Sequence, residues 1–156
     1  MRKRDVQVLL LTAPSGGGKT TICLRTIELA QARGLCVAGI LSPPVEQNGV
    51  KTAIKLRDLS TGQERILARR GGEGEPRVGC WTFDPAAVAW GQKVLASLPP
   101  CDLLVIDEIG PLELEMGAGL TNALDALRGA SYRLALVTVR PALVRAVIMS
   151  YAPHQG

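Results

Sequence analysis

The sequence has few aromatic residues, a single histidine and no closely spaced pair of cysteines. Aromatic residues make up 3% of the chain, and the only histidine, His154, lies in a polar tail where a catalytic residue is rarely found. The four cysteines stand far apart, each within an apolar stretch: Cys23, Cys36, Cys80 and Cys101. We therefore expect reduced, buried thiols in a cytoplasmic protein.

Long hydrophobic runs are also missing, and so is a dense cluster of charge of one sign. The run Leu9–Leu11 leads directly into glycine-rich residues that a cleaved signal peptide could not spare, and no segment is long enough to span a bilayer. The net charge is +4, but the basic residues cluster only at positions 1–4 and 68–70. They are too dispersed to predict a nucleic-acid partner, and they are more typical of solubilising surface charge.

What the chain has is enough apolar material for one core. It has 156 residues, 47% of them hydrophobic, with no internal repeats and no low-complexity segment. This length predicts a single domain over residues 1–156, and we expect it to be a monomer.

Apolar runs alternate with segments of helical spacing. Strands are predicted at 6–11, 35–41, 101–110 and 132–140, and helices at 20–34, 84–98, 111–127 and 141–151. Continuous apolar runs are typical of parallel strands covered on both faces. Between the second strand and the second helix, an antiparallel hairpin over about residues 45–83 is expected, with a turn at Ser60–Gln63. The fold class is therefore α/β: a mostly parallel sheet flanked by helices, with an inserted antiparallel hairpin.

A glycine-rich loop joins the first strand to the first helix. Backbone N–H groups of such a loop converge on phosphate oxygens, and the helix N-terminus adds a partial positive charge. Lys19 would reach the β- and γ-phosphates, and the Thr20 hydroxyl would bind Mg²⁺. The predicted nucleotide-binding residues are Ala13, Pro14, Ser15, Gly16, Gly17, Gly18, Lys19, Thr20 and Thr21.

Ala13 stands where the pattern G-x-x-x-x-G-K-[ST] begins with glycine. Alanine is unfavourable there only if the backbone needs a positive φ, which the sequence does not reveal. Because the three glycines and the Lys-Thr pair remain, we expect a functional loop.

Two acids end the strand "LLVIDE". Ligands of open α/β sheets bind at the carboxyl ends of the strands, so Asp107 is the predicted Mg²⁺ ligand. Neighbouring residues of a strand point in opposite directions, so Glu108 need not compete for the metal and is the candidate general base. The plainer alternative is a solvated strand end.

The segment "LSTGQER" looks like the L-S-G-G-Q signature of ABC-type ATPases, which opens a helix. Here Gly71, Gly72, Gly74 and Pro76 would break such a helix, so a hairpin turn is preferred.

Together with the glycine loop, "LSTGQER", "PRVG" and "VIDEIGPLELE" resemble the P-loop nucleoside-triphosphatase family that includes thermophile enzymes and the human cancer-related nucleoside-triphosphatase. The resemblance runs from about Val6 to Val139. It implies a RecA-like P-loop fold and slow, Mg²⁺-dependent hydrolysis of ATP, GTP and other triphosphates with little base preference. It also implies the roles given above for Lys19, Thr20, Asp107 and Glu108, with Lys19 and Glu108 as the catalytic residues.

The chain departs from the family at Ala13 and at its end, "MSYAPHQG", which lacks the last strand and the Asn-Arg segment that members usually carry. Three residues keep two interpretations. Glu113 would support the site from a helix start, or merely favour a first helical turn. Arg77 and Arg140 would each meet phosphate charge, or be solvated.

Two other functions use the same motifs. A P-loop kinase would pass the γ-phosphate to a small-molecule or nucleic-acid acceptor. A nucleotide-gated binding module would use hydrolysis to reset a partner or nucleic-acid interaction. Glu108 beside Asp107 favours water as the acceptor.

Overall fold

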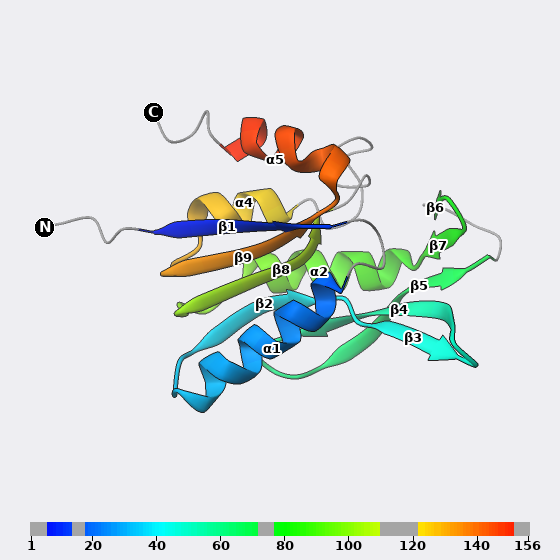
Figure 1. Ribbon diagram of the computed structural model, residues 1–156, viewed down its shortest axis with the longest axis horizontal. Coiled ribbons are helices and arrows are strands. Elements are labelled where there is room, and N and C mark those ends of the chain that lie inside the picture. Colours follow the sequence, from blue (N-terminus) through cyan, green and yellow to red (C-terminus); the bar gives the residue numbers. More distant parts are fainter. Residues whose placement is uncertain (1–5, 14–17, 72–76, 110–121, 152–156) are drawn as a thin grey trace, which may run out of the picture.

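Four apolar strands form the parallel half of the sheet. The computed structural model describes residues 6–13, 18–71, 77–109 and 122–151, and its strands follow the order β1-β9-β8-β2 in this half (Figure 1). The strands are β1 (Gln7–Thr12), β9 (Leu134–Val139), β8 (Leu103–Ile109) and β2 (Val37–Leu41), and all three pairings are parallel. Their carboxyl ends therefore meet at one edge of the sheet, and the predicted α/β class is confirmed.

The antiparallel half continues the same sheet. Strand β4 (Val50–Asp58) pairs with β2 on one side and with β5 (Glu64–Arg70) on the other. The remaining strands are β3 (Pro44–Gln47), which pairs with β4, and β7 (Trp81–Phe83) and β6 (Arg77–Val78), which follow β5. The predicted hairpin is thus present, but it is part of a larger antiparallel extension of the central sheet.

The segment "LSTGQ" forms the turn between β4 and β5. The carboxylate of Asp58 accepts hydrogen bonds from the backbone N–H and the hydroxyl of Ser60, at 3.0 and 2.7 Å. The Gly62 N–H donates to the Asp58 carbonyl at 2.7 Å. A hairpin turn was predicted here in place of an ABC-type helix, and this prediction is confirmed.

Helices cover both faces of the sheet. Helix α1 (Lys19–Ala32) lies on one face, and α2 (Pro85–Ala96), α4 (Asn122–Gly129) and α5 (Val144–Tyr151) lie on the other (Figure 1). A 3₁₀ turn, η1 (Pro141–Leu143), precedes α5. Asp84 caps the N-terminus of α2, and its carboxylate accepts a hydrogen bond from the Ala86 N–H at 2.9 Å. Most of the helix predicted at 111–127 lies outside the described residues, and α4 covers only its end.

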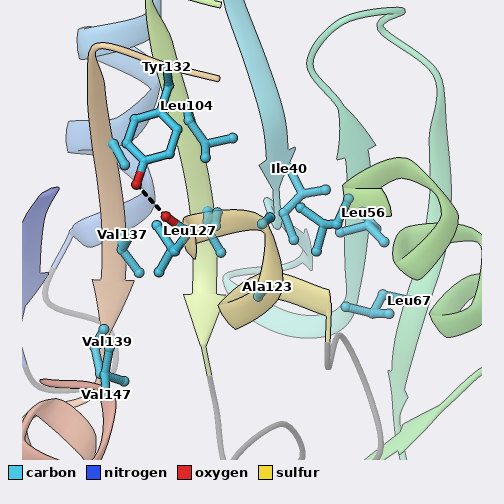
Figure 2. Close-up of a cluster of buried hydrophobic side chains, with 14 of the residues drawn as sticks. Ile40, Leu56, Leu67, Leu104, Ala123, Leu127, Tyr132, Val137, Val139 and Val147 are labelled. Atoms are coloured by element: carbon cyan, nitrogen blue, oxygen red, sulfur yellow. Dashed lines mark hydrogen bonds between the residues drawn. The ribbon is translucent and has the colours of Figure 1, made fainter. Parts of the chain in front are cut away.

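Two hydrophobic clusters hold these layers together. The cluster under α2, α4 and α5 includes the fully buried Ile40, Leu56 and Leu104, and Tyr132 donates its hydroxyl to the Leu127 carbonyl there (Figure 2). Burial raises the pKa of Tyr132 above its ordinary value. The cluster under α1 includes Cys23. Each fully buried aliphatic side chain contributes about 1.5 to 3 kcal/mol.

Two expectations about burial are wrong. Strand β1 stands at one end of the strand order, and both Val6, just before it, and Leu9, within it, are about half exposed, so β1 is not covered on both faces. Cys36 and Cys80 are exposed, whereas Cys23 is buried; the thiols of all four cysteines are free. Within the described ranges, no helix has the length and hydrophobicity needed to cross a membrane.

Candidate functional site

The site begins where β1 ends and α1 starts. Gly18 is the N-cap residue of α1, has φ 84° and provides no side-chain cap. The first helical hydrogen bond runs from the Ile22 N–H to the Gly18 carbonyl at 3.1 Å. The N–H groups of the first turn therefore lack intrahelical acceptors, as an anion site requires. Pro14, Ser15, Gly16 and Gly17 lie outside the described residues.

Lys19 folds back across the loop. Its side chain is buried, and Nζ donates to the Ala13 carbonyl at 3.2 Å. Asn48 is the one non-glycine among the described residues with a positive φ, so Ala13 does not have a positive φ. Alanine in place of the first glycine is therefore compatible with this loop, and it supplies the carbonyl that holds the lysine.

Asp107 lies at the centre of the site. Only 2% of its surface is exposed, and its carboxylate accepts three hydrogen bonds from residues that the structure describes. Oδ2 accepts from the Thr20 hydroxyl at 3.0 Å and from the Ser42 N–H at 3.2 Å, and Oδ1 accepts from the Thr138 hydroxyl at 2.6 Å. The structure thus brings together Thr20 and Asp107, which are 87 positions apart in the sequence. A buried carboxylate is stable when hydrogen-bond donors replace its lost hydration in this way.

The pairing between β8 and β9 is irregular at Asp107. Ile106 pairs with Val137, and the next pair is Ile109 with Val139, so Asp107 and Glu108 together stand opposite one residue of β9. Such bulges redirect side chains and are common beside active sites. Strict alternation along the strand therefore does not assign the two acids to opposite faces. The structure describes Glu108 as a residue of β8, but not its side chain.

Ser42 and Thr138 were not identified from the sequence. Ser42 follows β2 directly, and its hydroxyl also donates to the Asp107 carbonyl at 2.6 Å. Thr138 is the hydroxyl-bearing residue of the otherwise apolar strand β9. The available signal was a polar residue at the end, or near the end, of a predicted strand.

Cys23 belongs to the hydrophobic cluster under α1 and interacts electrostatically with Asp107. Cys23 of α1 is fully buried, and its burial, with a smaller effect from the Asp107 charge, raises the pKa of its thiol to about 12. The thiol is therefore neutral at physiological pH and adds no second charge beside Asp107.

The other candidate residues lie in different places. Thr21 is exposed on α1, and Arg140 lies directly after β9, where it is the N-cap residue of η1. Arg77 belongs to β6, at the opposite end of the strand order from β1. Glu113 and His154 lie outside the described residues.

The two tryptophans stack with arginine side chains. The Arg65 guanidinium lies 4.8 Å from the ring centroid of Trp90, and that of Arg70 lies 5.2 Å from Trp81. Trp90 also packs against the core cluster under α2, α4 and α5.

The sequence model of the NTPase family matches residues 8–153 of the chain. A nucleoside-triphosphatase THEP1 from Thermofilum pendens is 40% identical over 121 residues, which are 76% of this chain and 66% of the relative. Another from Ignicoccus hospitalis is 37% identical over 69% of this chain and 61% of the relative. The alignments thus span less than two thirds of the length of these relatives.

Solved structures show the same fold. The solution structure of a human cancer-related nucleoside triphosphatase superposes with a TM-score of 0.71 and 25% identity, covering 96% of this chain and 85% of the other. THEP1 from the hyperthermophile Aquifex aeolicus superposes with a TM-score of 0.68 over 96% of this chain and 86% of the other, at 16% identity. The second likeness supports the fold alone.

Proposed function

The chain belongs to the NTPase family, and on that premise we propose that it hydrolyses nucleoside 5′-triphosphates, ATP and GTP among them, to the diphosphate and phosphate with Mg²⁺. The observation that carries this proposal is the 3.0 Å contact between the Thr20 hydroxyl and the Asp107 carboxylate, beside the N-terminus of α1. It joins a hydroxyl and a carboxylate at the place where a metal-bound phosphate chain would lie.

The donor set fits Mg²⁺ in particular. Proteins usually hold this ion with one or two oxygen side chains, and water and substrate phosphates complete the shell. Thr20 and Asp107 provide such oxygens. An all-protein metal cage would need a group of three or more His, Cys, Asp or Glu ligands. The part of the chain that the structure describes contains no such group. When bound, Mg²⁺ would neutralise charge on the β- and γ-phosphates.

The remaining roles fall to side chains near the loop. Lys19 would exchange its contact with the Ala13 carbonyl for the phosphate oxygens, adding a positive charge to the backbone N–H groups of α1. Glu108 would accept a proton from the attacking water as the water oxygen bonds to the γ-phosphorus and the bond to the leaving diphosphate breaks. The products are the diphosphate and inorganic phosphate, so no further reactant is needed.

Paired variants of the two acids test this proposal. In Glu108→Gln, nucleotide affinity should stay within a few-fold while turnover falls roughly 10²- to 10⁴-fold, the usual contribution of a positioned base. In Asp107→Asn, turnover should also fall, and a higher Mg²⁺ concentration should be needed for half-maximal activity, because the metal shell loses a charge. Binding would be measured by calorimetry, and turnover by phosphate release during Mg²⁺ titration.

Two outcomes would favour another function. Diphosphate formed without free phosphate when an acceptor is supplied would indicate a kinase. Turnover that appears only with RNA, DNA or a partner protein would indicate a nucleotide-gated module. Parental hydrolysis by Glu108→Gln would refute the role of this residue as the base.

A further inference from the structure

Thr138 is a buried polar residue whose position suggests a role in the reaction. It lies in β9, the strand between β1 and β8, and none of its surface is exposed. Its hydroxyl donates to Asp107 Oδ1 at 2.6 Å, the shortest of the three hydrogen bonds to this carboxylate named above. Hydrogen bonds to a charged acceptor are short and about twice as strong as neutral ones.

The β8–β9 bulge places Thr138 opposite the two acids. Because Ile106 pairs with Val137 and Ile109 pairs with Val139, Thr138 is the one residue of β9 across from Asp107 and Glu108. A regular parallel pairing would put one residue opposite one. The bulge thus lies at the position where the Thr138 hydroxyl contacts the Asp107 carboxylate.

The two oxygens of Asp107 are held by different parts of the protein. Oδ1 is held by the Thr138 hydroxyl from β9, whereas Oδ2 faces the Thr20 hydroxyl at the start of α1. Rotation of the carboxylate would break both contacts. Fixing Oδ1 therefore also fixes the direction in which Oδ2 is presented to Thr20.

We propose that Thr138 is a positioning residue that sets the affinity of the site for Mg²⁺ by holding Asp107 with Oδ2 toward Thr20. The proposal rests on the proposed function, in which Asp107 and Thr20 bind the metal. Outer hydrogen-bond partners of metal ligands typically change metal affinity or activity by 10- to 100-fold when removed. A threonine that served only packing would change stability and leave the Mg²⁺ requirement alone.

The test uses a graded series at this position. Thr138→Val keeps the shape and removes the hydroxyl, Thr138→Ser keeps the hydroxyl, and Thr138→Cys keeps a weaker donor. Thr82→Val is the matched control. Thr82 lies in β7, in the antiparallel half of the sheet, and its hydroxyl also donates a 2.6 Å hydrogen bond, but to the Gly71 carbonyl and not to Asp107. Nucleotide binding would be measured by calorimetry with Mg²⁺ and with EDTA, and Mn²⁺ binding by electron paramagnetic resonance, all well below each variant's melting temperature.

For Thr138→Val, we expect the half-saturating Mg²⁺ and Mn²⁺ concentrations to rise roughly tenfold. The affinity for nucleotide measured in EDTA should stay within about threefold of the parent. Thr138→Ser should stay close to the parent, Thr138→Cys should fall between, and Thr82→Val should not change metal dependence. If Thr138→Val does not fold, the comparison of Ser with Cys carries the test.

Four results separate the possible failures. Parental metal dependence in Thr138→Val, or equal losses with Mg²⁺ and with EDTA, would overturn the positioning role. Equal metal dependence of the Ser and Cys variants would do the same. If Asp107→Asn also left metal dependence unchanged, the failure would lie in the proposed function itself.

Discussion

The side chain of Lys19 reaches from the start of α1 to the end of β1, where the Ala13 carbonyl accepts a hydrogen bond from its ammonium group at 3.2 Å. The contact uses a backbone oxygen, which glycine and alanine provide equally. What the missing first glycine would have added is tolerance of a positive φ, and Ala13 does not have one. Nucleotide affinity should therefore depend much less on the identity of residue 13 than on the charge of residue 19.

This contrast gives a matched pair of variants. Lys19→Ala should abolish measurable nucleotide binding, because the cation that would meet the β- and γ-phosphates is lost. Ala13→Gly should bind within about threefold of the parent, a difference of less than about 0.7 kcal/mol. Calorimetry with ATP in the presence of Mg²⁺ checks both. Unchanged affinity in Lys19→Ala would contradict the assignment of the phosphate loop.

The sequence predicted the residues of the site that belong to local motifs, and it missed those that depend on strand order. Lys19 and Thr20 were identified because they follow a glycine-rich loop after an apolar run, and Asp107 because it ends another apolar run. Ser42 and Thr138 touch Asp107 only because β2 and β9 both flank β8. A single sequence does not specify which strands are neighbours, so it could not show these two contacts.

At the scale of elements, Gly39 determines how closely β2 approaches β8. It has φ 117°, and a Cβ atom at this position would lie 1.9 Å from the Val105 carbonyl oxygen of β8. Gly39 pairs with Val105 and Ile40 with Ile106, so this close approach aligns the end of β2 with Asp107. The Ser42 N–H then reaches the Asp107 carboxylate. The glycine thus couples strand packing to the geometry of the site.

Gly39→Ala should therefore be strongly destabilising. Both the overlap with a backbone oxygen and the unfavourable φ must be relieved, and we expect a loss of about 2 to 5 kcal/mol in the free energy of unfolding. Gly129→Ala at the end of α4 is the control, because its Cβ would meet no atom within 4 Å. It should leave stability unchanged or raise it by up to about 1 kcal/mol. Urea unfolding of the three proteins gives the comparison, and equal midpoints for Gly39→Ala and the parent would refute the argument.

At the scale of the whole molecule, the sheet has two halves that differ in predictability. The parallel half follows from continuous apolar runs that alternate with helical segments, and its strands agree with prediction to within a few residues. The antiparallel half was predicted as a hairpin insertion over about residues 45–83, but the separate strand β3, which pairs with β4, was not predicted. Short strands with mixed polar and apolar residues carry a weak periodic signal, which explains the difference. The exposure of β1 was missed for another reason, since its end position in the sheet is a property of topology alone.

The division of the sheet also bears on which nucleotides the protein accepts. In the described part of the chain, the contacts that define the site lie at the carboxyl edge of the parallel half, and they involve a lysine, two threonine hydroxyls, a serine and a carboxylate. Under the proposed function, these groups would contact the triphosphate and the metal bound to it, and every nucleoside triphosphate has the same triphosphate group. The described tryptophans are engaged elsewhere, with Arg65 and Arg70, and are not arranged around Asp107.

We therefore expect weak discrimination among bases. The values of kcat/KM for ATP, GTP, CTP and UTP should lie within about a hundredfold of one another, which is about 2.7 kcal/mol of differential transition-state stabilisation. Phosphate release would be measured for the four nucleotides at one Mg²⁺ concentration, with Lys19→Ala as the control that should lose activity toward all of them. Because a site that hydrogen-bonds a base can reject the wrong one by 10⁴-fold or more, a preference well above a hundredfold would show that base-reading contacts contribute to specificity in addition to those made by Lys19, Thr20 and Asp107.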